Sequence, residues 1–127
     1  MSDLERNKQT VREYLDLAFN QGRPEEAAQR YQGPTYIQHN PAAPNGAEAF
    51  IAFVKDFRGQ FPELRVDFKR FIAEGDFAVL HCHVKTTPED RGVAVVDIVR
   101  LENGKLVEHW DVVQPVPETS ANDNTMF

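Results

Sequence analysis

Residues 93–114 read VAVVDIVRLENGKLVEHWDVVQ and contain the clearest structural signal in the chain. Two runs rich in β-branched residues flank Asn103-Gly104, and an Asn-Gly pair in that setting is the strongest short-range signal for a β-hairpin. Asp97 interrupts the first run, and His109 and Asp111 interrupt the second. A carboxylate within a buried strand is costly unless it is paired or functional. The stretch therefore predicts a long hairpin within a sheet that carries three candidate functional side chains.

The overall composition fits one globular domain of 127 residues, because 41% of the residues are hydrophobic. The net charge of −6 argues against a nucleic-acid partner, since a phosphate backbone requires a basic surface. Cys82 is the single cysteine, so the sequence allows no internal disulfide and no metal-thiolate motif. No apolar run is long enough to cross a bilayer, and residues 1–6 do not resemble a signal peptide. We therefore expect a cytoplasmic protein with no membrane partner.

Three helices are predicted before the sheet. Residues 2–5 have the Ser-x-x-Glu spacing of a capping box, and residues 20–22 (Asn-Gln-Gly) end the helix that starts there. Pro24 opens a second, short helix, which Gly33-Pro34 ends. A third helix is predicted over residues 47–60, where Phe and Val recur on one face.

The hydrophobic pattern then changes from helical to alternating at Leu64. Long strands are predicted over residues 64–74 and 77–87, with a bulge near Phe71-Ile72, where the alternation slips. The hairpin follows them. A short extended segment at residues 35–39 precedes the third helix. These elements make the last part of the chain an antiparallel meander.

Helices at one end of a chain and a meander at the other define the α+β class. We expect a cone-shaped α+β barrel, with three N-terminal helices packed on a strongly curved, mostly antiparallel sheet. Such a cone has a closed bottom and holds a pocket. The predicted domain comprises residues 1–117, and residues 118–127 form a polar, loose C-terminal tail.

Side chains of a strand alternate between the two faces of a sheet. His81 and His83 share one face of their strand, and His109 and Asp111 share one face of theirs. The face opposite the two strand histidines is wholly apolar and fits a dimer contact; it comprises Ala78, Leu80, Cys82 and Val84. If the polar faces coincide, they line one pocket with His81, His83, Asp97, His109 and Asp111.

Histidine beside carboxylates in an apolar pocket suits general acid–base catalysis. Asp97 and Asp111 could repel one another and raise the pKa of one of them, which suits proton abstraction next to a carbonyl. In the structural alternative, Asp97 pairs with Arg100, Arg91 or a loop N–H and only stabilises the sheet. Tyr14 and Tyr36 could point their hydroxyls into the cavity, although packing is the ordinary role of such residues.

A metal site is the competing hypothesis. His81 and His83, together with His39 or His109 and an Asp, could bind zinc or iron. The cupin metal motif also has His-x-His on a strand, but it requires a Glu a few residues later, where this chain has residues 84–87 (Val-Lys-Thr-Thr). We therefore predict no metal and no other cofactor.

The chain resembles the SnoaL-like polyketide cyclase family of the nuclear-transport-factor-2-like superfamily. Three stretches carry the resemblance: YIQHNP at residues 36–41, DIVRLENGK at residues 97–105 and VEHWD at residues 107–111. Asp-Arg-Gly at residues 90–92 is similar to a segment in the branch described as predicted SnoaL-like aldol-condensation enzymes. The resemblance covers roughly residues 4–117.

The resemblance implies a cone fold with a deep apolar pocket, and a homodimer formed through the sheet. It also implies cofactor-free chemistry, in which an acidic residue acts as acid and base in an intramolecular aldol closure. On motif position Asp111 is the candidate for that role, with His109 beside it and Asp97 as a third catalytic candidate. The residues expected to contact the substrate are His39, at the pocket mouth or wall, with His81, His83, Tyr36 and Tyr14.

Three functions stay open at this point. The first is a cofactor-independent cyclase, isomerase or lyase that abstracts a proton from a small carbonyl-containing ligand. The second is a non-catalytic, dimeric module that binds a small ligand. The third is a metal-dependent enzyme that uses His81 and His83.

Overall fold

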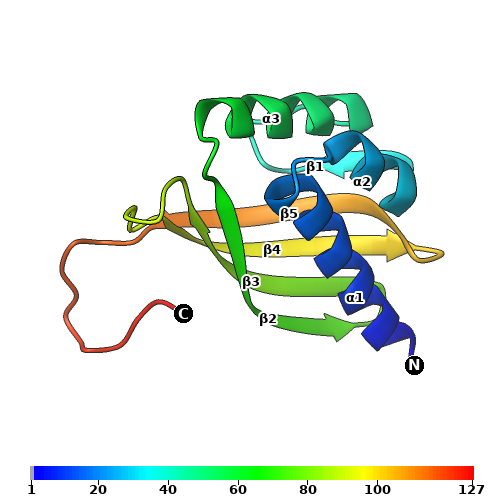
Figure 1. The fold of residues 1–127 in the computed structure, drawn as a ribbon. Helices are drawn as coiled ribbons and strands as arrows, with labels where there is room; N and C mark the ends of the chain where they lie inside the picture. Colours follow the sequence, from blue (N-terminus) through cyan, green and yellow to red (C-terminus); the bar gives the residue numbers. More distant parts are fainter. Residues whose placement is uncertain (1) are drawn as a thin grey trace.

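The computed structural model describes residues 2–127, in which three helices lie over one face of a five-stranded sheet (Figure 1). The helices are α1 (Asp3–Leu15), which continues into the π-helical turn η1 (Asp16–Asn20), α2 (Pro24–Tyr31) and α3 (Ala47–Gln60). The strands are β1 (Gln32–Gln38), β2 (Arg65–Glu74), β3 (Phe77–Lys85), β4 (Val93–Glu102) and β5 (Lys105–Pro115). The α+β class and the three N-terminal helices are therefore confirmed.

The helix ends follow from local chemistry. The Ser2 hydroxyl accepts a hydrogen bond from the Glu5 backbone N–H at 3.2 Å, as the capping spacing predicts. At the other end, the Asn20 side chain accepts from the Val66 N–H at 2.8 Å and donates to the Val66 carbonyl at 3.0 Å. This pair of bonds fixes η1 against β2. A π-helical turn of this kind often occurs at functional sites, and here it carries Phe19 toward the interior.

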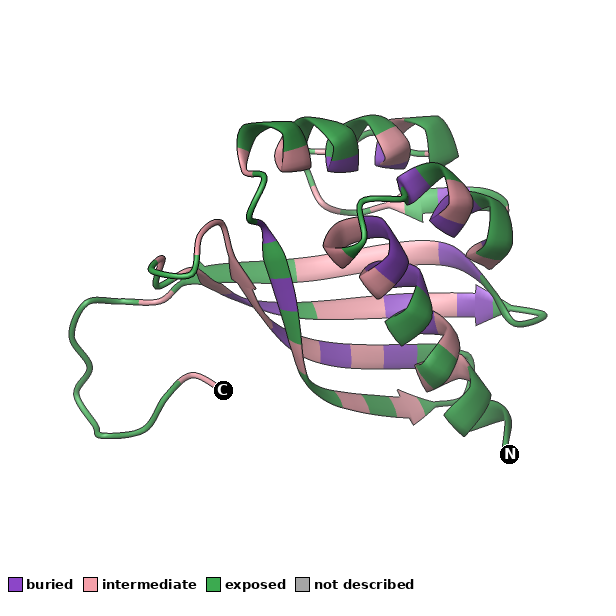
Figure 2. Ribbon diagram, in the orientation of Figure 1, coloured by how far each residue is buried: buried purple, intermediate pink, exposed green. Residues whose placement is uncertain are grey.

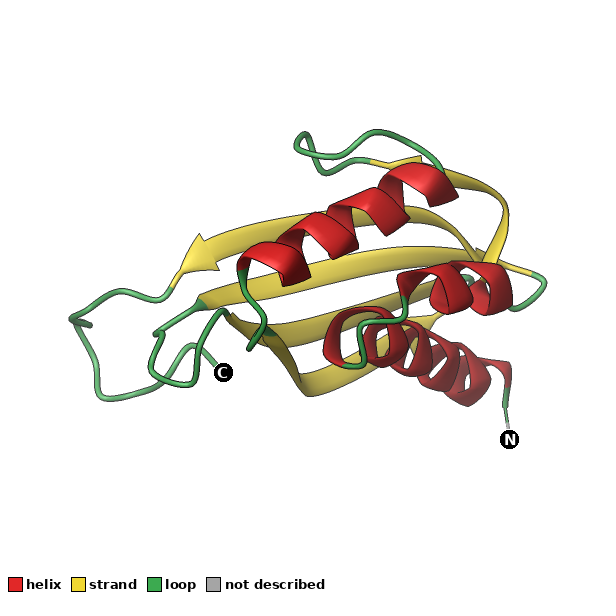
Figure 3. Cartoon of the chain, turned by 45° about the horizontal axis from the view of Figure 1, so that its top comes forward, coloured by secondary structure: helices red, strands yellow, loops and turns green. Residues whose placement is uncertain are grey.

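The strand order is β1-β5-β4-β3-β2, with β1 parallel to β5 and every other pair antiparallel. Asn103 and Gly104 both have positive φ, at 51° and 77°, as a tight hairpin turn requires. β2 contains a register shift between Phe68 and Arg70, so the bulge lies earlier in the strand than the predicted position near Phe71-Ile72. In the tilted view of Figure 3, all three helices lie over the same face of the sheet, with α1 nearest β2 and β3 and with α2 and α3 nearest β1.

The core lies between the sheet and the helices, and Figure 2 shows buried residues on the facing sides of both. Ala78, Leu80 and Cys82 of β3 are buried in this core. The prediction that this apolar face is free for a dimer contact is therefore wrong. The reason is the register, because Leu80 pairs with Asp97, and directly paired residues share a face.

The outer face of the sheet is partly apolar. Ile72, Phe77, Val96 and Val112 are exposed there. The tail segment 118–127 contains no helix or strand, and the Phe127 ring stacks on His83 with 4.1 Å between ring centroids. Within the described residues, no helix combines the length and the apolar character needed to cross a membrane.

Candidate functional site

Two adjoining cavities lie between the sheet and the helices. The polar one has a volume of ≈ 80 Å³ and contains His109, Gln38 and Tyr36 in its wall. The apolar one has a volume of ≈ 240 Å³ and extends along the sheet beneath Phe57. Both are lined by Leu15, Phe19, Asn40, Phe53, Asp97 and Asp111. The two carboxylates therefore stand where the polar and apolar cavities meet.

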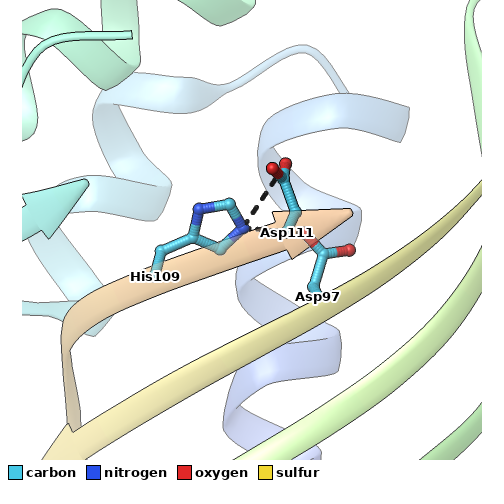
Figure 4. A group of neighbouring side chains, drawn as sticks. All are labelled: Asp97, His109 and Asp111. Carbon is cyan, nitrogen blue, oxygen red and sulfur yellow. Dashed lines mark hydrogen bonds and ion pairs between the residues drawn. The ribbon is translucent and has the colours of Figure 1, made fainter. Parts of the chain in front are cut away.

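The hairpin register brings the three predicted catalytic candidates together. Asp97 on β4 pairs directly with Asp111 on β5, and His109 lies two residues earlier on the same face of β5. The His109 Nε2 atom is 2.7 Å from Asp97 Oδ1 and 4.0 Å from Asp111 Oδ2 (Figure 4). The three side chains are only 12–13% exposed. Their low exposure strengthens every electrostatic interaction among them.

Gln38 is the second hydrogen-bond partner of His109, and it determines which ring nitrogen carries a proton. Gln38 Oε1 accepts from the Asn40 backbone N–H at 3.0 Å and lies 2.7 Å from His109 Nδ1. A backbone N–H can only donate, so the Gln38 atom is an acceptor and His109 Nδ1 carries a proton. The contact between His109 Nε2 and Asp97 then holds one further proton. The pair is either imidazolium with carboxylate or imidazole with carboxylic acid, and is neutral in both forms.

Burial raises the pKa of Asp97, because a desolvated carboxylate is less stable than its acid. The hydrogen bond from His109 opposes this rise, and the nearby charge of Asp111 adds to it. Arg100 donates to Glu108 and Glu102 on the outer face, and the Arg91 Nε–H donates to the Val116 carbonyl. The partner of Asp97 is therefore His109, which replaces the predicted structural pairing with either arginine.

Asp111 has a different environment from Asp97. The Asn40 Nδ2 atom donates to both of its oxygens, at 2.9 and 3.0 Å. Asn40 and Gln38 were not among the predicted site residues. The available signal was the alternation of Tyr36, Gln38 and Asn40, since residues at i, i+2 and i+4 of an extended segment share one face. All three line the polar cavity.

The two predicted tyrosines differ in position. Tyr36 lines the polar cavity and stacks on the His109 ring at a centroid distance of 6.4 Å. Tyr14 is buried behind it, and lies outside the lining of both cavities. Its hydroxyl accepts from Gln32 Nε2 at 2.7 Å and is hydrogen-bonded to Tyr36. Burial raises the pKa of both tyrosines, so both hydroxyls stay protonated.

The other three histidines lie outside both cavities. His81 accepts a hydrogen bond from Arg70, and the His83 Nε2–H donates to the Arg91 carbonyl at 2.7 Å. His39 donates to Glu108 at 2.7 Å and stacks on Trp110. The expected common face of His81, His83 and Asp97 is wrong, because His81 pairs with Val96 and not with Asp97. The expected position of His39 at the pocket wall is likewise wrong, because its ring lies against Trp110 on the outer face.

The grouping of possible metal ligands also differs from the predicted one. Asp97, His109 and Asp111 form a group whose possible ligand atoms all lie within 4.8 Å of one another. It is the one such group of three or more residues within residues 2–127. Both ring nitrogens of His109 already have hydrogen-bond partners. An ion bound to all three side chains would have to break the bond between His109 and Asp97.

Comparison with solved structures agrees with this fold. TsrD from Streptomyces laurentii is 25% identical, with a TM-score of 0.73 over 89% of this chain and 91% of that chain. A proposed SnoaL-like polyketide cyclase from Jannaschia sp. CCS1 is 22% identical, with a TM-score of 0.72 over 89% of each chain. A proposed polyketide cyclase from Acidithiobacillus ferrooxidans is 18% identical, with a TM-score of 0.72 over 89% of this chain and 91% of that chain.

A search of the curated proteins gives no match. The family described as SnoaL-like domain matches residues 11–109, which include β1, the β4–β5 hairpin turn and two of the three clustered side chains, Asp97 and His109. The chain therefore belongs to the SnoaL-like domain family.

Proposed function

We propose that this protein is a cofactor-independent acid–base enzyme that removes a proton next to the carbonyl group of a small ligand. The observation that carries the proposal is the position of Asp111. Its carboxylate lines both cavities, and its one side-chain hydrogen-bond donor among the described residues is the neutral amide of Asn40. A carboxylate at the edge of an apolar cavity, held in place but not neutralised, is suited to act as a base.

Asp111 is a better candidate for the base than Asp97. The Asp97 carboxyl shares a proton with His109 at 2.7 Å, whereas Asp111 lies 4.0 Å from the same nitrogen. The Asp97 oxygen that would take up a proton is already hydrogen-bonded to His109, so Asp111 is the more accessible carboxylate although burial raises the pKa of Asp97. In the proposed step the C–H bond breaks, the proton passes to Asp111, and the electron pair moves onto the carbonyl oxygen to form an enolate.

The enolate oxygen needs hydrogen-bond donors near the base. Tyr36 lines the polar cavity and keeps its proton, so its hydroxyl is the candidate donor. Donors fixed in place before the reaction stabilise developing charge most effectively. The enolate carbon can then attack a second carbonyl in the same molecule, as in a cyclase, or take up a proton at another carbon, as in an isomerase.

Deuterium exchange tests the proposal without knowledge of the natural substrate. In D₂O, the protein should exchange the hydrogens next to the carbonyl of 4-phenylbutan-2-one, which ¹H NMR follows directly. Asp111→Asn should lower the exchange rate by about 10²–10⁴-fold, the usual contribution of a general base. Asp56→Asn is the matched control, because it makes the same change at an exposed position on α3.

Equal exchange rates for Asp111→Asn and wild type would refute the role of Asp111. A wild-type protein that binds ketones and exchanges none of them would support the ligand-binding module instead. Circular dichroism spectra of both variants establish that each is folded before the rates are compared.

A further inference from the structure

The charged side chains that line the two cavities are Asp97, His109 and Asp111. Neither lining includes a lysine or an arginine. Arg91 lies in a separate, open groove that adjoins the apolar cavity at Phe57, and Arg58 donates to the Phe19 backbone carbonyl. A ligand in the cavities is therefore surrounded by apolar groups and by the charges of this one cluster.

The net charge of the cluster is negative wherever its shared proton lies. Asp97 and His109 together are neutral, because one proton bridges His109 Nε2 and Asp97 while Nδ1 keeps its own. Asp111 then contributes one uncompensated negative charge, since its partner Asn40 is neutral. The side chains around it are mostly apolar, so water screens this charge weakly.

The remaining wall of the larger cavity is apolar. Phe19, Phe53 and Phe57 line it from the helical side, and strand valines such as Val66 and Val95 line it from the sheet. Its volume of ≈ 240 Å³ lies below the roughly 300–1,000 Å³ of pockets for drug-sized ligands. The site thus has room for one small apolar body, with the polar head of the ligand beside Asp111.

We propose that the cavity selects its ligand by charge, and that Asp111 is the residue that decides the selection. The substrate is an electroneutral carbonyl compound with one small apolar body. An ammonium ion on the same skeleton binds as a competitor, and a carboxylate is excluded. This inference rests on the proposed function, because it assigns the substrate to the same cavity. It adds a class of ligand that acid–base chemistry alone does not specify.

Three compounds with related skeletons test the charge selection: 4-phenylbutan-2-one, 3-phenylpropan-1-amine and 3-phenylpropanoate. Titration calorimetry at neutral pH should show that the amine binds at least about tenfold more tightly than the carboxylate, since both interact with one poorly screened charge. The ketone should lie between them. The amine should also compete with the ketone.

Asp111→Asn should reduce the ratio of amine to carboxylate affinity by about tenfold or more, because it removes the uncompensated charge and keeps the side-chain shape. Arg91→Gln is the control, since it changes a charge in the outer groove and should leave the ratio unchanged. A wild-type ratio near one, a ratio that Asp111→Asn does not change, or binding of none of the three compounds would overturn the inference.

The two proposals fail in different ways. Deuterium exchange that depends on Asp111, without any preference among the three compounds, would overturn the charge selection and leave the enzyme proposal intact. A preference that depends on Asp111, with no exchange in any ketone, would support the charge selection and overturn the acid–base chemistry.

Discussion

Tyr14→Phe should lower the free energy of unfolding more than Tyr31→Phe, which removes the other tyrosine hydroxyl of α1 and α2. The Tyr14 side chain is only 1% exposed, and its hydroxyl accepts from Gln32 Nε2 at 2.7 Å. Gln32 Oε1 already lacks a hydrogen-bond partner within the described part of the chain. Without the hydroxyl, the amide nitrogen also loses this acceptor in a place that water does not reach. A buried polar group left unsatisfied costs about 1–3 kcal/mol.

Tyr31→Phe is the matched control, because the half-buried Tyr31 packs edge-on against Tyr14 and donates to Glu13 at 3.1 Å through a solvent-exposed hydrogen bond. Water replaces that bond, so the cost should stay within about 0.5 kcal/mol. Urea unfolding followed by circular dichroism measures both free energies of unfolding.

A double variant, Tyr14→Phe with Gln32→Leu, gives the decisive comparison. Removing both partners of a buried hydrogen bond leaves no orphaned donor, so the double variant should be more stable than Tyr14→Phe alone. Equal losses of stability for Tyr14→Phe and Tyr31→Phe, or a double variant less stable than Tyr14→Phe, would show that the buried hydrogen bond does not have this role.

Two further predictions concern the sheet. The pKa of Asp97 is higher in the folded protein than its ordinary value of 3.8. Its contribution to stability is therefore complete at a pH below 3.8 and is lost as the pH rises through the pKa of the folded state. The melting temperature of wild type should therefore fall relative to that of Asp97→Asn as pH increases, and a constant difference would contradict the shift. We also propose that the outer face forms the homodimer. Val112→Glu, at a side chain that is 73% exposed there, should then give a monomer in light scattering, while Thr119→Glu in the tail should not. A wild-type monomer would end that proposal.

The hairpin was predictable because its signals are local. Alternation and the Asn103-Gly104 turn fix the face on which His109 and Asp111 lie, and the structure has both on the inner face. The relation between strands was not predictable in the same way. Moving a strand by one residue transfers all its side chains to the other face. The residues of β3 alone do not show that Leu80, and not His81, pairs with Asp97.

The helix boundaries also divide into those set by local sequence and those set by distant contacts. Residues 47–60 were predictable as a helix because the phenylalanine repeat lies within the segment and Pro62 follows shortly after it. The π-helical turn η1 depends on distant partners, since Asn20 bonds to Val66 on β2. A contact between residues that are 46 positions apart cannot be detected in a local sequence pattern. Phe19, which this turn directs to both cavities, could therefore not be identified as a lining residue from the sequence.

The site depends on the edge strand β1 as much as on the hairpin. The hairpin supplies the groups that titrate, and the segment that starts with β1 supplies the groups that orient them. Gln38 fixes the proton on His109 Nδ1, and Asn40 holds both oxygens of Asp111. Because β1 joins β5 in parallel and its last residue Gln38 pairs with His109, the chain that follows brings Asn40 to Asp111. A carboxylate that is hydrogen-bonded by a neutral amide keeps its negative charge uncompensated. A carboxylate paired with lysine or arginine would be a weaker base, because the positive charge stabilises its ionised form. The amide of Asn40 is therefore the feature that allows one carboxylate of the pair to stay reactive while the other is neutralised by His109.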